Sequence, residues 1–561
     1  MLKYNWLKKI LEDLKPIFTE VFIGSLFINL LAIAVPIFVL QVYDRVISHS
    51  GISTLQGLML GMLGVIFFDF ILRQTRSKLM QRVAVNLDVK VNDLLFTKIT
   101  SLPLQKIEST SGSYWHLLFQ DITSLRNALS GHSAILACDL PFALIFIFFI
   151  FIIASPIAWI LVLIFFIFSI IAWKASESVT EASRSEKKNI VTKESLLSEI
   201  ISARSTIKSL NFTKKTKHDF DIKQEASILG SMTRGNRTDF FMNLGHSLTI
   251  TTTVILTTAG AISIINKELT IGALIATNML AGRLLGPLNQ LIGTWRILTN
   301  LKESLARLDQ LFNIKNESYN SSINLQNIAG EIKLENASFK YHQKSKPALD
   351  RINLYISSNS INTIIGPNSS GKTTLLKTIL GLYHPFEGRV ILDGADIKQI
   401  GRKDLANLIG YVPQETFLFD STIKENILWS NTNIPDDQVI KICESINLHK
   451  TIIDMPDGYG TIVGEQGQNL SSGVRKKVAI ARSLVGNPKI IIMDEPTNNL
   501  DQESERVLTR LIFDLSKYKS IIIVSHSQSI IDISNNLILM NNSKIIKSGM
   551  KEEVIKAIQN L

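Results

Sequence analysis

Residues 361–374 read Ile361-Asn362-Thr363-Ile364-Ile365-Gly366-Pro367-Asn368-Ser369-Ser370-Gly371-Lys372-Thr373-Thr374. The first five residues predict a strand, and the apolar residues from 375 to 380 predict a helix after the loop. Backbone N–H groups in such a loop can surround phosphates, Lys372 can reach the β- and γ-phosphates, and Thr373 can place its hydroxyl on Mg²⁺. In a chain of this length the pattern arises by chance only about 2% of the time. We therefore expect residues 366–374 to bind ATP.

A second motif extends the nucleotide site. Residues 490–496 form an apolar run that ends in Asp494, Glu495 and Pro496. Asp494 is suited to hold Mg²⁺ and Glu495 to polarise the attacking water as a general base. Two acids can also simply end a strand, but a position about 120 residues after a phosphate loop favours the catalytic interpretation.

Size and charge limit the remaining possibilities. The 561 residues exceed one hydrophobic core, so two or more domains are expected. The net charge of +11 could indicate nucleic-acid binding, but the basic residues concentrate beside apolar segments, as the positive-inside tendency requires. Cys138 and Cys443 have neither zinc-site nor disulfide-framework spacing, which suits a protein facing the cytosol.

The first half of the chain predicts a membrane domain. Six apolar segments each approach the ~20 residues that ~30 Å of hydrocarbon requires. They are residues 21–42, 55–72, 133–154, 157–173, 244–265 and 271–293. Lysines before the first segment place the N-terminus in the cytosol, and the lack of a signal-cleavage site makes that segment an uncleaved anchor.

The expected organisation is a polytopic α-helical membrane domain fused to an α/β P-loop domain. The membrane domain covers residues 1–310, an Asn/Ser-rich linker covers 311–329, and the nucleotide domain covers 330–561. The long basic loops 73–132 and 174–243 are expected to be helical and to extend from the membrane. Residues 112–121 and 211–220 are the expected tips that meet the ATPase domain; ordinary solvated helical turns are the alternative.

Further motifs occur in a fixed order around the phosphate loop. They are Tyr341 in SFKY, Gln414 in YVPQE, Leu470-Ser471-Ser472-Gly473-Val474, Asp501 in NNLD and His526 in VSH. With the phosphate loop and the Asp494-Glu495 pair, this set resembles the ATP-binding cassette (ABC) proteins. The resemblance implies the fold of a type I ABC exporter, with six spans and a helical subdomain in the cassette.

The resemblance also implies roles. Tyr341 stacks on adenine, Gln414 senses the γ-phosphate and Mg²⁺, and His526 contacts the γ-phosphate. Ser471, Ser472, Gly473 and Asp501 belong to the nucleotide site, and the signature of one subunit completes the phosphate loop of another. A helix N-terminus there offers donors to a γ-phosphate. A single cassette then implies a homodimer that binds two ATP molecules.

Three positions depart from the family pattern. Ser472 replaces the usual glycine, Val474 the usual glutamine, and Ser369 a common glycine. The retained catalytic residues predict two active sites with modestly weakened hydrolysis. Residues 465–467, Glu-Gln-Gly, resemble the exporter segment that contacts the inner-loop tips, which favours an exporter over an importer.

Residues 35–46, 269–276 and 282–288 resemble the membrane domains of bacterial type I protein-secretion ATPases. The resemblance implies export of a protein across the inner membrane, with the ATPase domain cytoplasmic. A periplasmic adaptor and an outer-membrane duct are implied as partners. Only about twenty residues precede the first span, so we expect no peptidase domain.

The sequence is also compatible with other functions. An exporter of lipids, drugs or small peptides would use the same scaffold, and a non-transporting regulatory ATPase is a more distant possibility. Asp69 and Arg283 are ionisable residues in or near apolar segments, where charge is costly. They could serve transport, form a structural salt bridge or extend towards the membrane surface. Six spans exclude a soluble cassette protein of translation or DNA repair.

Overall fold

The computed structural model describes residues 4–48, 50–317, 328–342, 345–429 and 433–559. By its internal contacts the chain forms two units. One contains residues 1–100 and 110–314, and the other contains residues 101–109 and 315–561. The short segment 101–109 from the first inner loop therefore packs with the nucleotide domain, although it lies in the membrane half of the sequence.

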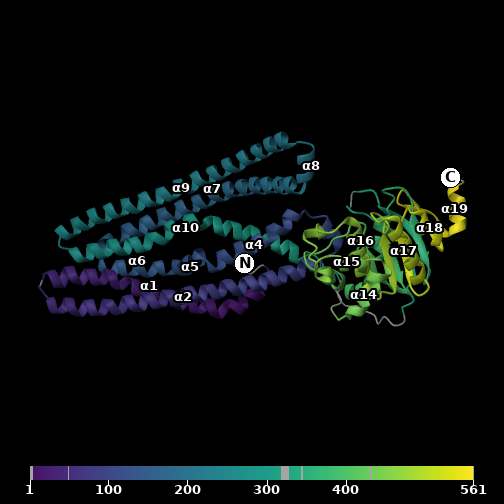
Figure 1. The fold of residues 1–561 in the computed structure, drawn as a ribbon. Helices are drawn as coiled ribbons and strands as arrows, with labels where there is room; N and C mark the ends of the chain where they lie inside the picture. The colour runs from purple at the N-terminus through teal and green to yellow at the C-terminus, as the bar shows by residue number, and fades with distance from the viewer. Residues whose placement is uncertain (1–3, 49, 318–327, 343–344, 430–432, 560–561) are drawn as a thin grey trace. The chain divides into compact units, whose positions relative to one another are not determined.

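The first unit is entirely helical in the residues described (Figure 1). Its elements are α1 (Asn5–Gln41), π-helix η1 (Val42–Ile47), α2 (Ile52–Thr100), α4 (Gly112–Ser130), α5 (His132–Asp139), 3₁₀ helix η2 (Leu140–Phe142), α6 (Ala143–Ile153), α7 (Ser155–Ser202), α8 (Arg204–Ser209), α9 (Thr213–Ile265) and α10 (Ile271–Phe312). Six helical stretches among the described residues are long and apolar enough to cross a membrane. The predicted number of spans is confirmed.

The spans are parts of longer helices. The second, fourth and fifth predicted segments lie within α2, α7 and α9, which have 49, 48 and 53 residues. Apolar side chains on α2, including Leu60, Phe67 and Phe70, are exposed, as expected of a helix in contact with lipid. The third segment is divided, because η2 interrupts it between α5 and α6.

The tips of the inner loops differ from those predicted. The first loop turns at residues 101–111 around the short helix α3 (Leu104–Glu108), and residues 112–121 are the first turns of α4. The prediction of the first tip was wrong because Asp121 belongs to a buried contact: its carboxylate accepts hydrogen bonds from Arg307 and Ser304. In the second loop α8 precedes the turn, so the predicted 211–220 covers that turn and the start of α9.

Two segments that resemble secretion ATPases meet at one helix end. Asp44, in η1, accepts hydrogen bonds from the Thr270 hydroxyl at 2.6 Å and from the Gly272 amide at 3.0 Å. The carboxylate thus caps the N-terminus of α10, where negative charge is favourable.

The two charges singled out in the sequence have different surroundings. Asp69 pairs with Arg73, one turn further along α2, with 2.7 Å between Oδ2 and Nε. That contact agrees with the structural alternative for Asp69. Arg283 is exposed on α10 and has no hydrogen-bond or ion-pair partner among the described residues.

The second unit contains two sheets. Its strands are β1 (Ile332–Phe339), β2 (Leu349–Ile356), β3 (Ile361–Ile365), β4 (Glu387–Leu392), β5 (Ala395–Asp396), β6 (Ile409–Val412), β7 (Ile490–Asp494), β8 (Ser520–Val524), β9 (Asn536–Asn541) and β10 (Lys544–Met550). The larger sheet has the order β10-β9-β3-β8-β7-β6, and the smaller has the order β2-β1-β4-β5. In the larger sheet β9, β3, β8, β7 and β6 are parallel, so the loops after β3 and β7 lie at the same edge.

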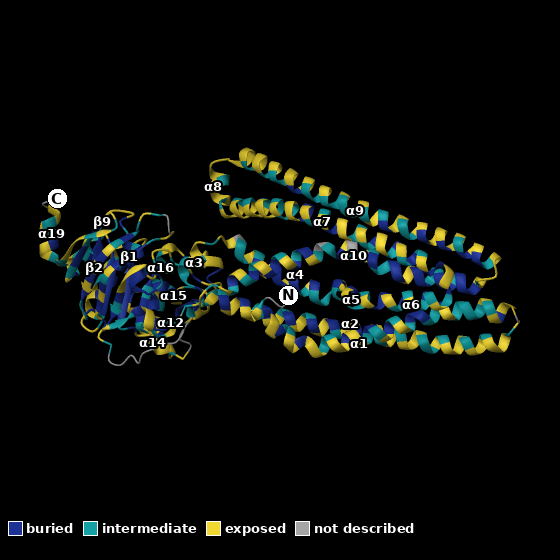
Figure 2. Ribbon diagram, turned by 180° about the vertical axis from the view of Figure 1, so that it is seen from behind, coloured by how far each residue is buried: buried dark blue, intermediate teal, exposed yellow. Residues whose placement is uncertain are grey.

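Helices cover the larger sheet and form a separate helical part. The helices are α11 (Lys372–Ile379), α12 (Arg402–Leu408), α13 (Ile423–Leu428), α14 (Asp436–Ser445), α15 (His449–Ile453), α16 (Ser472–Val485), α17 (Gln502–Leu515), α18 (Gln528–Ile533) and α19 (Lys551–Gln559). Strands β3, β7 and β8 are buried throughout, as their mostly apolar sequences predict. Figure 2 shows the buried residues gathered in the sheet region of this unit. Helices α13–α16 lie between β6 and β7 in sequence, which confirms the expected α/β domain with a helical subdomain.

Candidate functional site

The predicted phosphate loop connects β3 to α11. Gly366 and Gly371 have φ angles of 148° and 100°, in the region that favours glycine. A Cβ atom at Gly366 would lie 2.1 Å from the carbonyl oxygen of Met540, and one at Gly371 would lie 2.6 Å from that of Ala348. Both glycines are therefore required for this loop to fold, whether or not a ligand is bound.

The loop contains groups suited to phosphate. Lys372 is buried, and its ammonium donates to the carbonyl oxygens of Gly366 at 2.6 Å and Pro367 at 3.0 Å. Burial lowers the pKa of Lys372, while the nearby Glu495 and Asp494 raise it. The buried Ser370 hydroxyl has no hydrogen-bond partner among the residues that the structure describes. An unpartnered donor beside a lysine and a helix N-terminus fits an anion.

One departure from the family pattern has a structural consequence. Ser369 has a φ angle of 64°, which is left-handed backbone. A residue with a Cβ atom in this conformation costs about 1–2 kcal/mol relative to the right-handed one, whereas glycine does not pay this penalty. The Ser369 side chain is exposed, so it meets no crowding from other elements beyond this local backbone cost.

The two predicted metal ligands are in contact. The Thr373 hydroxyl, at the start of α11, donates to Asp494 Oδ2 at 2.8 Å. Asp494 is the last residue of β7 and is 1% exposed. Burial raises the pKa of Asp494, and the hydrogen bond from Thr373 and the nearby lysines oppose that rise. Hard oxygen donors of this kind suit Mg²⁺, so the residues fit the ion.

Glu495 and His526 lie next to each other at the same edge of the sheet. His526 Nε2 is 3.7 Å from Glu495 Oε1, and the Glu495 amide donates to the carbonyl of Val524 at 2.9 Å. Glu495 has a φ angle of 46°, a strained conformation that is concentrated at functional sites. Burial raises the pKa of the Glu495 carboxyl, while His526 lowers it.

Beside these residues lies a cavity of about 480 Å³, whose lining does not include Gly366, Pro367 or His526. It is lined by Tyr341, Ala348, Asn368, Ser369, Ser370, Gly371, Lys372, Thr373, Thr374, Gln414, Asp494, Glu495 and Val524. The cavity thus brings together most of the residues predicted for nucleotide, metal and catalysis. Tyr341 is among the lining residues; its hydroxyl hydrogen-bonds with that of Thr374 at 2.8 Å, and the residue is 43% exposed.

Other predicted residues lie outside this cavity. Ser471 caps α16 by accepting a hydrogen bond from the Val474 amide, and Ser472 and Gly473 form the exposed or half-exposed first turn. Asp501 caps α17 by accepting from the Ser504 amide at 2.7 Å. These four residues do not line the phosphate site of their own chain.

Sequence reasoning missed Lys476, which connects three parts of the site. The residue is 3% exposed in α16, and its ammonium donates to the carbonyls of Pro413 at 2.9 Å, Gln414 at 3.2 Å and Asp494 at 3.4 Å. Burial lowers the pKa of Lys476, while the nearby carboxylates of Asp494 and Glu495 raise it. A lysine one turn from the buried Ala479 and Ile480 was the available signal.

Sequence reasoning also missed the contacts of α3. Gln105 donates to the carbonyls of Lys340 and Tyr341, each at 3.1 Å. Glu108 accepts from Lys377 at 2.8 Å and from the Tyr383 hydroxyl. Lys377 belongs to α11, so this segment of the first inner loop contacts both Tyr341, which lines the nucleotide cavity, and the helix that follows the phosphate loop. Residues 101–109 carry no motif that points to these partners.

A membrane-spanning helical unit, joined to a P-loop domain with paired acids and a helical subdomain, defines an ATP-driven membrane transporter. The sequence pattern of the ABC transporter transmembrane region matches residues 18–288, and that of the ABC transporter matches residues 349–498. The chain belongs to the ABC transporter family. It is therefore a multi-pass membrane protein that binds a nucleotide and couples ATP hydrolysis to transport.

Relatives match along the whole chain. The Alpha-hemolysin translocation ATP-binding protein HlyB of Escherichia coli is 32% identical over 100% of this chain and 79% of its own length. The Leukotoxin export ATP-binding protein LtxB of Aggregatibacter actinomycetemcomitans is 31% identical over 99% and 78%. The fold resembles a solved bacterial Atm1-family ABC exporter with ATP bound, with a TM-score of 0.86, 19% identity and coverage of 97% and 96%.

Proposed function

We propose that this protein exports a polypeptide across the bacterial inner membrane as the ATPase and permease of a type I secretion system. The observation that carries this proposal is similarity to toxin-translocation proteins over essentially the whole chain, membrane unit included. A cassette alone would match many transporters with other substrates. The N-terminus and the ATPase domain then face the cytoplasm, in line with the lysines before the first span.

The site residues take the following roles in this proposal. Residues 366–374 bind the phosphates, with the Lys372 ammonium moving from the loop carbonyls to the β- and γ-phosphates. Thr373, Asp494 and Gln414 hold Mg²⁺, directly or through water. When bound, the ion neutralises charge on the phosphates. Tyr341 stacks on adenine.

Hydrolysis requires a base and a group that orients it. Glu495 accepts a proton from the attacking water, and its raised pKa brings it closer to the pH at which a base is effective. His526 lies within reach of Glu495 and contacts the γ-phosphate.

A homodimer completes each site. Ser471 and Ser472 are exposed and Gly473 is half-exposed at the N-terminus of the 14-residue helix α16, and none of the three lines the nucleotide cavity of the same chain. Those donors face a γ-phosphate when the signature of one copy meets the phosphate loop of a second copy. Asp501 lies beside this interface. Ser472 and Val474, which differ from the family pattern, weaken hydrolysis only modestly.

ATP binding closes the two cassettes, and the inner loops pass that movement to the spans. Gln105 and Glu108 of α3 contact the adenine side and α11, so they respond to nucleotide. Residues 465–467 are the proposed contact for the loop tips. A periplasmic adaptor and an outer-membrane duct complete the export route.

The proposal is tested by affinity capture from the native membrane after crosslinking, with Glu495→Gln used to hold the ATP-bound dimer. Recovery of an adaptor and a secreted protein supports protein export. A homodimer accompanied only by lipid favours the lipid or small-molecule exporter instead. In parallel, the purified wild type should show vanadate-sensitive ATP hydrolysis that Glu495→Gln abolishes; an inactive wild type contradicts the catalytic assignment.

A further inference from the structure

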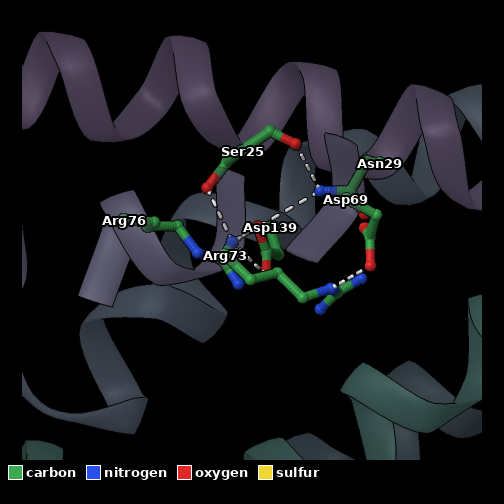
Figure 3. A network of polar contacts seen from close by, with 6 residues as sticks. All are labelled: Ser25, Asn29, Asp69, Arg73, Arg76 and Asp139. Atoms are coloured by element: carbon green, nitrogen blue, oxygen red, sulfur yellow. Dashed lines mark hydrogen bonds and ion pairs between the residues drawn. The ribbon is translucent and has the colours of Figure 1, made fainter. Parts of the chain in front are cut away.

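A buried ion pair joins three spans of the membrane unit. Arg76 Nη1, on α2, lies 2.9 Å from Asp139 Oδ1 and 3.1 Å from Oδ2, and it also donates to the Ser25 hydroxyl at 3.0 Å. Asn29 donates to Asp139 Oδ1 at 3.1 Å. Figure 3 shows these side chains converging from α1, α2 and α5.

The pair is shielded from solvent. The side chain of Arg76 is 9% exposed and that of Asp139 is 22% exposed. Separating such a pair would leave a charge without compensation in a poorly solvated place, which is strongly unfavourable. The segments of α2 and α5 that contain these residues are therefore expected to move together.

Asp139 lies directly before a break in the third span. It is the last residue of α5, and the next three residues, Leu140–Phe142, form the 3₁₀ helix η2 with Pro141. Proline removes a backbone hydrogen bond, and short 3₁₀ segments within helices often mark hinges. Beyond the break, Phe146 and Ile150 of α6 pack in an apolar cluster that also contains residues of α1, α7, α9 and α10.

The other end of α2 leads to the nucleotide domain. The helix runs without interruption to Thr100, and the following residues 101–109 pack within the cassette unit. Residues 101–103 join α3 to α2, so a displacement of α3 that pulls on this connection would reach Arg76 along the uninterrupted helix α2. The third span is thus clamped to that helix on one side of η2 and packed against other spans on the other side.

We propose that Arg76 and Asp139 form a clamp that makes the third span bend at Leu140–Phe142 when ATP moves α2. The inference rests on the proposed function only in requiring that ATP binding displaces the inner loops. It goes beyond that function by identifying the contact, Arg76–Asp139, through which the movement of α2 reaches the third span. Asn29 and Ser25 extend the clamp to α1.

The chain supplies both a reporter and a control. Cys138 is half-buried beside Asp139, and the other cysteine, Cys443, lies buried in the cassette unit. Asp69 and Arg73 form a second carboxylate–guanidinium pair on α2, but within one helix and at higher exposure. Asp69→Asn therefore removes a similar charge without unlinking α2 from α5.

The test measures the rate of Cys138 alkylation by mass spectrometry, using the full chain in lipid nanodiscs. Each variant also carries Glu495→Gln and is compared with and without MgATP. With the clamp intact, ATP is expected to change the rate by about fivefold or more. Arg76→Gln and Asp139→Asn should reduce the change to within about twofold, whereas Asp69→Asn should retain it.

Bound ATP is measured for every variant, so that loss of the cassette fold is detected. The exchanged pair Arg76→Asp/Asp139→Arg should restore the ATP-dependent change, which a variant damaged by misfolding would not do. A full response in Arg76→Gln, or no response in the parent protein, overturns the proposal. No exported substrate is used, so failure of the secretion experiment does not affect this outcome.

Discussion

Replacing Lys476 by methionine is expected to reduce ATP hydrolysis by about 10- to 100-fold. The change keeps an unbranched side chain but removes the ammonium that holds the carbonyls of Pro413, Gln414 and Asp494. Two of these contacts, at 2.9 and 3.2 Å, have the lengths of ordinary hydrogen bonds. A charge-assisted bond contributes about 1.5–3 kcal/mol.

Desolvation of the ammonium offsets part of that gain, since burial lowers the pKa of Lys476. We therefore expect a net loss equal to about one such bond, 1.5–3 kcal/mol, which corresponds to the expected change in rate. The loss appears in hydrolysis because the freed loop contains Gln414, which lines the nucleotide cavity.

The adjacent Lys477 provides a matched control. Among the described residues, its ammonium donates a hydrogen bond to the carbonyl of Asn447, at 3.2 Å, near the surface. Steady-state ATP hydrolysis is measured for both methionine variants in nanodiscs, together with their thermal unfolding temperatures. Lys477→Met should stay within about twofold of the wild type, since exposed contacts contribute little. If Lys476→Met matches Lys477→Met in rate, the connecting role of Lys476 is wrong.

Three further predictions concern stability and pH. Asp121→Asn removes the carboxylate that hydrogen-bonds to the Arg307 guanidinium and leaves Glu303, 3.9 Å away, as the remaining carboxylate, so stability should fall by about 1.5–3 kcal/mol, visible as a lower unfolding temperature. Gly272→Ala places a Cβ atom 2.6 Å from Asp44 Oδ1 and should destabilise by about 1–3 kcal/mol, whereas Gly282→Ala, with no atom within 4 Å, should be neutral. Because burial raises the pKa of Glu495 above 4.5, hydrolysis should decline as pH falls towards a midpoint above 4.5.

The nucleotide site could be predicted closely because its chemistry depends on short local patterns. The strand before Gly366 and the strand that ends at Asp494 can each be recognised from its own short sequence. Both strands pair in parallel with β8, so their carboxyl ends lie at the same edge of the sheet. His526 could be placed only through the family resemblance, because nothing local to that residue indicates its neighbour Glu495.

The residues that connect elements could not be predicted in the same way. Lys476 and Arg76 have partners 62 and 63 positions away, at Gln414 and Asp139, and no spacing rule links such distant positions. The first inner-loop tip was misplaced for a related reason. Helix α2 continues to Thr100 without a sequence break, and α3 is positioned by contacts with the cassette rather than by a local signal.

The packing of residues 101–109 within the second unit affects how the cassette would behave as a separate fragment. A protein made from residues 330–561 alone would lack Glu108, leaving the almost completely buried Tyr383 without its hydrogen-bond acceptor. It would also lack Gln105, and with it two hydrogen bonds at residues 340 and 341. Such a fragment should bind ATP with altered affinity, and a synthetic peptide of residues 101–109 should restore the affinity of the intact protein. The folded catalytic module is therefore assembled from two separate lengths of chain.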